Sequence, residues 1–219
     1  MAFHIPKPTG FQSMLKSGAR AYSGIEEAVY RNINACMELS DTVKSAYGPM
    51  GMNKIIVNHI DKLFVTNDAA TIIREMEVQH PAAKMIVMAS MQQEEEAGDG
   101  TNFVLLFAGA LLKHAEKLLK NGLALTDIQK GYELARDYTL NDVLPGLVVS
   151  TCEDLLNAEH VRRAIKTSLG SKQYGYEDFL AKLIAETCIA TLSKDASPMT
   201  FSVDNVRICK VVGSGVTAR

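Results

Sequence analysis

The sequence lacks the charge excess and the long apolar segment that define several protein classes. It contains 23 Lys and Arg against 25 Asp and Glu, a formal net charge of −2, so it offers no basic field for nucleic acid and no polybasic patch for a membrane. The longest uniformly apolar run, residues 103–112, is too short to span a bilayer. We therefore expect neither a nucleic-acid partner nor a membrane partner.

Paired cysteines, histidine clusters and targeting signals are also missing. No two cysteines form a CxxC pair, which favours free buried thiols in a reducing compartment over disulfides or a metal site. The five histidines are scattered, without the spacing of metal ligands. The first ten residues contain Pro6 and Pro8 and no apolar core, so no signal peptide is predicted. These features predict a cytoplasmic protein. The four cysteines are Cys36, Cys152, Cys188 and Cys209.

The residue pattern predicts a mainly α-helical protein with one small β-hairpin. After an irregular arm over residues 1–22, apolar residues recur at helical spacing over residues 25–47. Two short β-rich runs follow, 55–59 and 63–66, and Asp61-Lys62 between them suits a tight turn. Further helices are predicted over residues 69–78, 82–96, 102–120 and 126–143, the last one capped by Thr126 and closed by Pro145.

Two of these predicted helices carry unusual apolar faces. Met85, Met88 and Met91 fall on one face of the 82–96 helix, and we interpret this stripe as core filling rather than as a binding surface. The first half of the 102–120 helix is apolar on all sides, which predicts a place at the centre of the domain. Such a helix needs covering on every side, and we expect some of its partners to lie outside this chain.

The pattern after residue 145 is of a different type. Residues 151–168 and 177–192 are predicted to form two amphipathic helices joined by 169–176, and residues 202–212 a β-segment with one apolar side. A single strand leaves its backbone groups unpaired. We therefore expect the sequence to stop inside a larger architecture.

The strongest candidate for chemistry is the Gly-Asp-Gly-Thr-Asn segment at residues 98–102. Its two glycines let the backbone approach a ligand, and the following helix starts with unpaired amide donors at its positive end, an arrangement that suits phosphate. Asp99 is the type of oxygen ligand that Mg²⁺ takes together with waters and phosphate oxygens. Taken alone, the same segment is also a common turn. The candidate donors are the amides of Gly100, Thr101, Asn102 and Phe103.

Three further segments have two interpretations each. Residues 47–54 either form a backbone cradle or only turn into the hairpin. Asp68 is either a functional acid or the N-cap of the next helix. Residues 167–172 place hydroxyls and one ammonium at a helix end, where these groups either bind a phosphate or have no ligand. No GxxxxGK[ST] motif is present, so a Walker-type nucleotide fold is unsupported.

Taken together and in order, these segments resemble the group II chaperonins. The chain contains GPMGMNK at 48–54, TNDAAT at 66–71 and GDGTN at 98–102, and the resemblance runs from about residue 3 to about residue 215. The segments LFVTNDAAT and EVQHPAAKMIVMAS resemble the theta-type subunits of the eukaryotic cytosolic chaperonin in particular.

The resemblance implies a domain organisation. Residues 1–145 would form the N-terminal half of a helical equatorial ATP-binding domain with a small β-hairpin. Residues 146–215 would form the first half of an α/β intermediate domain, and residues 216–219 would be the truncated start of an apical domain. Residues 216–219 fit the family poorly, and we interpret this as a sign of a truncated gene model or an alternative transcript.

The resemblance also implies roles for individual residues. Asp99 would hold Mg²⁺, and Asp68 would act in catalysis beside the γ-phosphate of ATP. The aspartate that orients the attacking water in this family lies in its C-terminal half and has no counterpart here. The implied nucleotide-binding residues are Tyr47, Gly48, Pro49, Gly100, Thr101, Asn102, Phe103, Gly170, Ser171 and Lys172.

The activity that the resemblance implies is ATP-dependent folding of client proteins. Its cofactors would be ATP and Mg²⁺, and its partners would be paralogous subunits in a hetero-oligomeric double ring together with unfolded client proteins. The N-terminal arm and the hairpin would contact neighbouring subunits. Two alternatives stay open: a fragment that binds nucleotide or assists ring assembly without hydrolysis, and a helical scaffold that binds no nucleotide.

Overall fold

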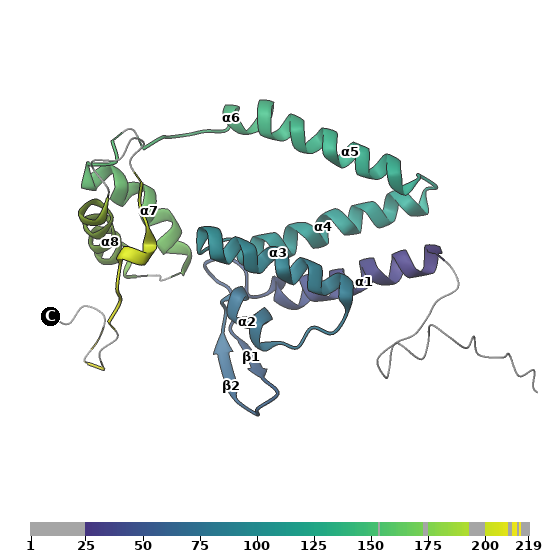
Figure 1. Ribbon diagram of the computed structural model, residues 1–219, viewed down its shortest axis with the longest axis horizontal. Coiled ribbons are helices and arrows are strands. Elements are labelled where there is room, and N and C mark those ends of the chain that lie inside the picture. The colour runs from purple at the N-terminus through teal and green to yellow at the C-terminus, as the bar shows by residue number, and fades with distance from the viewer. Residues whose placement is uncertain are drawn as a thin grey trace, which may run out of the picture. The chain divides into compact units, whose positions relative to one another are not determined.

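The computed structural model describes residues 25–152, 154–172, 175–192, 200–209, 212–213 and 215. These residues are mainly helical with one two-stranded antiparallel hairpin, which confirms the predicted fold class (Figure 1). The predicted arm at residues 1–22 and the closing residues 216–219 lie outside the described part. The chain divides into two compact units, residues 1–47 with 52–128 and residues 48–51 with 129–219, and each is described by itself.

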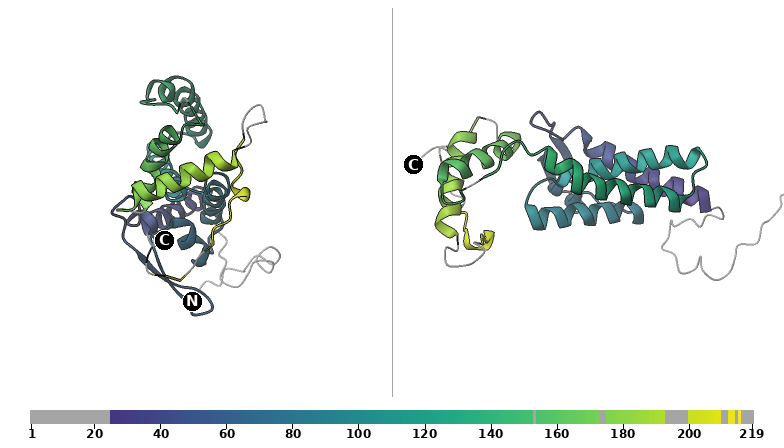
Figure 2. Two further views of the ribbon diagram at one scale, coloured as in Figure 1. Left: turned by 90° about the vertical axis from the view of Figure 1, so that its left-hand side faces the viewer. Right: turned by 90° about the horizontal axis from the view of Figure 1, so that it is seen from above.

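Three long helices form the body of the first unit. They are α1 (Ile25–Lys44), α3 (Pro81–Ala97) and α4 (Thr101–Lys120), and they lie side by side in both views (Figures 1 and 2). Asn102 at the start of α4 donates a hydrogen bond to the carbonyl of Val43 near the end of α1, so these two helices run antiparallel. None of the helices in the described residues is long and apolar enough to cross a bilayer.

A short fourth helix, α2 (Ala69–Glu75), closes one end of the first core. It packs against α3 and α4, and its Ile72 is almost completely buried. Because the core draws on four different helices, it fixes where each of them begins or ends. The buried core residues are Leu39, Val43, Ala46, Ala69, Ile72, Ile73, Ala83 and Leu105.

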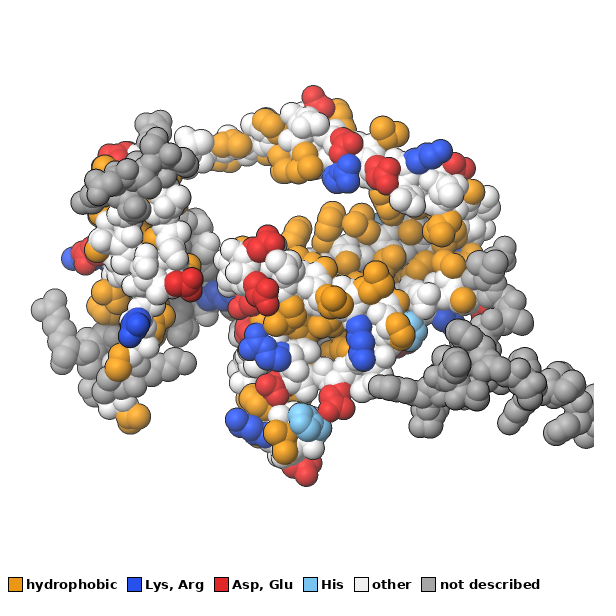
Figure 3. Space-filling view, viewed as in Figure 1, with side chains coloured by type: hydrophobic (Ala, Val, Ile, Leu, Met, Phe, Trp, Pro, Cys, Tyr) orange, Lys and Arg blue, Asp and Glu red, His pale blue; other side chains and the backbone are white. Residues whose placement is uncertain are grey.

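Part of the apolar surface of α3 and α4 remains exposed, contrary to the predicted core stripe on α3. The central place predicted for α4 agrees with its contacts with α1, α2 and α3. Met85 and Met88 are 71% and 70% exposed, so only Met91 of the predicted core stripe packs against the core. Phe103 and Phe107 are 54% and 52% exposed and stack on each other with ring centroids 5.6 Å apart. Hydrophobic side chains gather over both helices on the face shown in Figure 3. The reason is that α1, α2 and α3 cover only part of the circumference of α4.

The cysteine prediction holds in part. All four thiols are free. Cys36 is buried in α1, and burial raises the pKa of its thiol, whereas Cys152 and Cys209 are exposed and the prediction of buried thiols is wrong for both. Periodicity identified Cys36 as a core position. The helix predicted around Cys152 and the β-segment predicted around Cys209 do not form there, so the sequence pattern gave no correct indication of their exposure.

The hairpin pairs β1 (Lys54–Val57) with β2 (Leu63–Thr66), in a register that places Val57 opposite Leu63. The connection is a five-residue loop over residues 58–62 rather than the tight turn predicted at Asp61-Lys62. Asn58 explains the difference, because its side-chain oxygen accepts hydrogen bonds from the amides of Ile60 and Lys62 at 3.1 and 3.0 Å. These bonds stabilise the wider loop.

Asn58 also joins the hairpin to α2, which leads to a stability prediction. Its side-chain nitrogen donates to the carboxylate of Glu75 at 3.0 Å. Replacing Asn58 by alanine leaves two loop amides and one carboxylate without this partner, and we expect the free energy of unfolding to fall by about 2 kcal/mol. Chemical denaturation measures this loss, and hydrogen exchange at Ile60 and Lys62 locates it.

A matched variant separates the two functions of Asn58. Asparagine to aspartate keeps the oxygen that accepts from the loop amides but replaces the donor to Glu75 by a second carboxylate. We expect Asn58→Asp to keep slow exchange at the loop amides while weakening the link to α2. An Asn58→Ala protein as stable as the parent would contradict this account of the loop.

The second unit is built on the antiparallel pair α7 (Ala158–Lys172) and α8 (Glu177–Thr191). The prediction placed the start of the first helix at residue 151, but the helix begins at 158, because the side-chain oxygen of Asn157 accepts from the Glu159 amide at 3.0 Å. Along the chain they follow α5 (Leu125–Tyr138), one π-helical turn (Thr139–Val143) and the short α6 (Leu144–Gly146).

The β-segment predicted over residues 202–212 is not found among its described residues. Val203–Asn205 instead form one turn of 3-10 helix, and residues 206–209 have no regular structure. A strand is stable only with a partner strand, and the described residues of this unit supply none. Apolar alternation in the sequence is therefore not sufficient to form a strand here.

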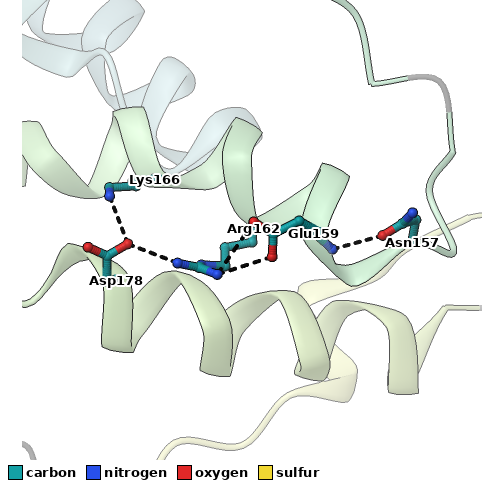
Figure 4. A network of polar contacts seen from close by, with 5 residues as sticks. All are labelled: Asn157, Glu159, Arg162, Lys166 and Asp178. Atoms are coloured by element: carbon teal, nitrogen blue, oxygen red, sulfur yellow. Dashed lines mark hydrogen bonds and ion pairs between the residues drawn. The ribbon is translucent and has the colours of Figure 1, made fainter.

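A network of ion pairs joins α7 to α8 (Figure 4). Asp178 at the start of α8 lies between Lys166 and Arg162 of α7, at 2.7 and 3.1 Å, and Arg162 also contacts Glu159. The hydrogen bonds from Lys166 and Arg162 lower the pKa of the Asp178 carboxyl below its usual value. The carboxylate is thus stabilised in its charged form in the folded chain.

This shift predicts a pH dependence with a definite sign. A carboxyl whose pKa is lowered by folding contributes stability at neutral pH, and the contribution disappears as the pH falls below the usual aspartate range through the lowered value. We expect Asp178 to titrate below an ordinary aspartate in a carboxyl NMR titration. In the double variant Arg162→Gln, Lys166→Gln it should titrate at the ordinary value. Titration of the parent at or above that value would contradict the geometry of the network.

Candidate functional site

The segment between α3 and α4 reverses the chain within three residues. Gly98 ends α3 with φ +68°, and Gly100 precedes α4 with φ +84°, so both lie in the left-handed region that glycine adopts without strain. Between them, the carboxylate of Asp99 accepts a hydrogen bond from the Gly100 amide at 2.7 Å. The two glycines therefore place Asp99 at the N-terminal end of α4, as predicted from the sequence. We call this end the mouth of α4.

Two side chains of α3 hold this segment, and the sequence analysis did not identify either of them. The Gln93 side-chain nitrogen donates to the carbonyl of Asp99 at 3.0 Å. The hydroxyl of Ser90, which is fully buried, donates to the carbonyl of Thr101 at 2.9 Å. Their i, i+3 spacing would have placed both on one helix face, and a serine on an otherwise apolar face is the signal that was available.

The backbone donors at this helix start number three rather than the four predicted. The Gly100 amide already donates to Asp99, whereas Thr101, Asn102 and Phe103 occupy the first turn, where the helix itself supplies no acceptor for their amides. These three amides lie at the positive end of a 20-residue helix. They suit an anionic group such as a phosphate.

Asn102 fastens the start of α4 to the end of α1. Its side-chain nitrogen donates to the Val43 carbonyl at 3.4 Å, and its side-chain oxygen is buried without a hydrogen-bond partner among the described residues. Amide groups buried in this way are usually satisfied by a further donor such as a water or a ligand. The side chain of Asn102 thus has acceptor capacity left at the mouth of the helix.

Asp68 is the N-cap of α2, so the more local of its two interpretations is confirmed. Its carboxylate accepts from the amide of Thr71 at 3.0 Å and from the hydroxyl of Thr71 at 2.8 Å, and its own amide donates to the hydroxyl of Thr66 at 3.1 Å. These bonds fix the orientation of the carboxylate. A role beside a phosphate is compatible with the capping role and stays a prediction.

The core brings the predicted segments of the first unit together. Ala46, Ala69 and Leu105 belong to one cluster of buried residues. Tyr47 directly follows the first of them, Asp68 directly precedes the second, and the loop that carries Asp99 lies one helical turn before the third. Tyr47 itself is half exposed. Three segments far apart in the sequence therefore surround one end of the same core.

The other predicted nucleotide-binding residues belong to the second unit. Gly48 has φ +90° and its carbonyl accepts from the Gly51 amide, which makes the segment with Pro49 a turn. The segment 170–172 lies in the last turn of α7 rather than in the predicted connection 169–176. The Ser171 hydroxyl donates to the Ser168 carbonyl at 2.7 Å and so satisfies a carbonyl near the helix end. The residues in that turn are Gly170, Ser171 and Lys172.

The donor set at the mouth of α4 fits a magnesium ion that arrives with a nucleotide. Within the described residues, no three His, Cys, Asp or Glu side chains gather into a metal site. Mg²⁺ needs no such cage, because it keeps several waters and takes one or two carboxylates together with phosphate oxygens. A carboxylate has about four acceptor positions, so one that accepts hydrogen bonds can also act as a metal ligand.

A groove of about 210 Å³ at the other end of α1 and α4 does not fit an anionic ligand. Apolar side chains make up nearly all of its wall, and Asn32 is its single polar lining residue. Because burying an unpaired phosphate charge in such surroundings is costly, the groove is no alternative to the helix mouth. Its lining residues are Val29, Asn32, Ile33, Cys36, Ala82, Leu112, Ala115, Leu119 and Leu125.

Comparison with known proteins decides the family. The sequence profile of the TCP-1/cpn60 chaperonin family matches residues 39–218. The chain belongs to this chaperonin family. The match includes all three motifs that carry the resemblance, at 48–54, 66–71 and 98–102.

Relatives of this chaperonin-family chain agree with the subunit type indicated by its motifs. It is 57% identical over 218 residues to T-complex protein 1 subunit theta of Gallus gallus and 56% identical over 218 residues to that of Homo sapiens. It is 50% identical over 216 residues to that of Caenorhabditis elegans. These alignments cover 99% to 100% of this chain and 39% of each relative, so the chain spans well under half of their length.

Proposed function

We propose that this chain binds Mg-ATP at the mouth of α4 as the nucleotide-binding part of a chaperonin subunit. The observation that carries the proposal is the Asp99–Gly100 turn, which sets a carboxylate beside three amides at a helix N-terminus. A magnesium-bound triphosphate needs a carboxylate for the metal and hydrogen-bond donors for the phosphate oxygens, and this turn offers both at one place. Family membership supports this choice over other anions.

Each residue at the site has a separate proposed task. The amides of the first turn of α4 would donate to phosphate oxygens, and Asp99 would hold the metal, which would supply positive charge to the phosphates. The carboxylate of Asp68, oriented by Thr71, acts near the γ-phosphate and helps to order the metal and the attacking water. Tyr47, Gly48, Pro49 and residues 170–172 are the further residues proposed to contact the nucleotide. We also propose that the equatorial domain ends at residue 145 and that the intermediate domain begins at residue 146.

The complete protein that contains this part is proposed to hydrolyse ATP and to fold client proteins in the cytosol. Its partners would be paralogous subunits in a hetero-oligomeric double ring and unfolded clients. The hairpin supports a contact with neighbouring subunits, because one of its faces exposes four apolar side chains. They form the cross-strand pairs Ile55 with Val65 and Val57 with Leu63.

A second candidate function is nucleotide binding without turnover. It is favoured by the fact that the chain spans only 39% of the length of its relatives. Positioning of the attacking water needs groups from the rest of a complete subunit, according to the family resemblance. Under this alternative the chain retains the phosphate donors and the metal ligand but releases no phosphate.

Two measurements on the 219-residue chain separate these candidates. Isothermal titration calorimetry with Mg-ATP tests binding, and single-turnover phosphate release tests hydrolysis. Binding with release supports the first candidate, and binding without release supports the second. No binding at millimolar Mg-ATP would overturn the proposal and favour the remaining alternative, a helical scaffold that binds no nucleotide.

A further inference from the structure

We propose that Gln93 and Ser90 of α3 are positioning residues for the turn before α4, an inference that rests on the proposed nucleotide site. Ser90 aims a phosphate-binding amide of α4, and Gln93 aims the Gly100 amide that holds the carboxylate of Asp99. Both side chains donate to backbone carbonyls in the turn between the helices, Gln93 to Asp99 at 3.0 Å and Ser90 to Thr101 at 2.9 Å. Both bonds go to backbone carbonyls rather than to the carboxylate or to the amides themselves. They act through the orientation of two peptide planes.

Peptide planarity converts these two bonds into control of two donors. In a trans peptide the carbonyl of one residue and the amide of the next point in opposite directions. Holding the Thr101 carbonyl against Ser90 therefore aims the Asn102 amide away from α3. Holding the Asp99 carbonyl against Gln93 likewise aims the Gly100 amide away from α3, where it meets the carboxylate of Asp99.

The turn depends on these bonds because its glycines do not determine its conformation by themselves. Gly98 and Gly100 have φ +68° and +84°, and glycine visits both halves of conformational space with similar ease. The contact with α3 is close, since a Cβ atom at Gly100 would lie 3.2 Å from the Gln93 side-chain nitrogen. Ser90 is completely buried and Gln93 is half buried, so water competes little for their bonds. The hydrogen bonds from Ser90 and Gln93 of α3 therefore hold this turn in place, and we call them the clamp.

The neighbouring glutamine provides a matched control. Gln92 lies one residue away on the same helix, but it is exposed and donates only to the side chain of Glu96 at 2.8 Å. Methionine has about the same length and helix propensity as glutamine and lacks the donor. The variants Gln93→Met and Gln92→Met therefore make the same chemical change with and without loss of the clamp.

The test compares the two variants in the 219-residue chain by four measurements. We expect Gln93→Met to weaken Mg-ATP binding about tenfold, the lower end of the effect of removing a residue that orients a metal ligand. Its affinity for adenosine, which lacks phosphates, should stay within twofold of the parent, and so should its urea midpoint. Hydrogen exchange at Gly100, whose amide donates to Asp99, should become at least tenfold faster. Gln92→Met should resemble the parent in all four measurements.

The outcomes separate this inference from the proposed function. If the parent binds Mg-ATP and Gln93→Met binds within twofold of it, or if both variants weaken binding equally, the positioning role is overturned. If the parent binds no nucleotide, the proposed function fails, and unchanged exchange at Gly100 in Gln93→Met would overturn the clamp as well. Equal loss of adenosine and Mg-ATP affinity would indicate general destabilisation and also contradict the inference.

Discussion

Replacing Asp99 by asparagine is expected to abolish the magnesium-dependent part of ATP binding while leaving the fold intact. The asparagine oxygen can still accept the hydrogen bond that Asp99 accepts from Gly100 at 2.7 Å, so the turn keeps its cap. The charge that suits Mg²⁺ is lost. We expect the affinity for Mg-ATP to fall about 100-fold, since removal of groups that merely orient a metal ligand already costs 10- to 100-fold.

Calorimetric titration with and without EDTA measures this effect. The parent should bind ATP more tightly with magnesium than without it, and Asp99→Asn should bind equally weakly under both conditions. Asp127→Asn is a suitable control, because Asp127 is also an acid near the start of a helix, in the first turn of α5. If Asp99→Asn kept the magnesium dependence of the parent, Asp99 would not be the metal ligand.

The second large effect is expected from alanine at Gly109, at the crossing of α1 and α4. A Cβ atom there would lie 2.5 Å from the Cβ of Ser40 and closer still to its hydroxyl oxygen. Both residues are buried, so neither helix can yield without disturbing the core. Overpacking of this kind costs about 3 kcal/mol, whereas alanine gains about 1 kcal/mol of helix propensity. We expect a net loss of about 2 kcal/mol in the free energy of unfolding.

A compensating variant tests whether the loss comes from this contact. In Gly109→Ala, Ser40→Gly the nearest remaining atom of residue 40 is its Cα at 4.0 Å, so the double variant should be more stable than Gly109→Ala alone. Gly131→Ala in α5 is the control, because no atom lies within 4 Å of its added Cβ, and it should be as stable as the parent or more stable. Urea denaturation of the four proteins gives the comparison. Equal stability of Gly109→Ala and the parent would show that the helices are farther apart than described.

Both predictions concern α4, the first at its N-terminal end and the second in its middle. The close approach at Gly109 sets the distance between α1 and α4, and the bond from Asn102 to Val43 lies two turns away on the same pair of helices. We infer that the geometry at the mouth of α4 depends on the packing along its length. Measuring Mg-ATP affinity in Gly109→Ala alongside its stability would report this dependence directly.

Local sequence signals located most elements of the fold. Helical spacing, Gly and Pro stops and two β-rich runs placed α1, α3, α4, α8 and the hairpin close to their observed bounds. The larger error was the start of α7, which was predicted at residue 151 and lies at residue 158. The cap at Asn157 overrides an amphipathic pattern that continues on both sides of it. The β-segment over residues 202–212 was wrong because strand formation depends on a partner that the described residues do not provide.

The sequence by itself determined which segment could carry a charged ligand. A carboxylate between two glycines directly before an apolar helix specifies a turn, a helix start and free amides through local conformational preferences alone. Family membership could be inferred for the same reason, since it depends on the order of short motifs along the chain.

Only the tertiary structure decided how that segment is held and what surrounds it. Ser90 and Gln93 contact the turn because α3 folds back beside α4, and no local preference shows which of several polar residues on α3 will face it. The exposure of Met85 and Phe103 was likewise hidden, because burial depends on which other elements cover a face. Local chemistry is encoded by neighbours in sequence, whereas orientation and burial are set by neighbours in space.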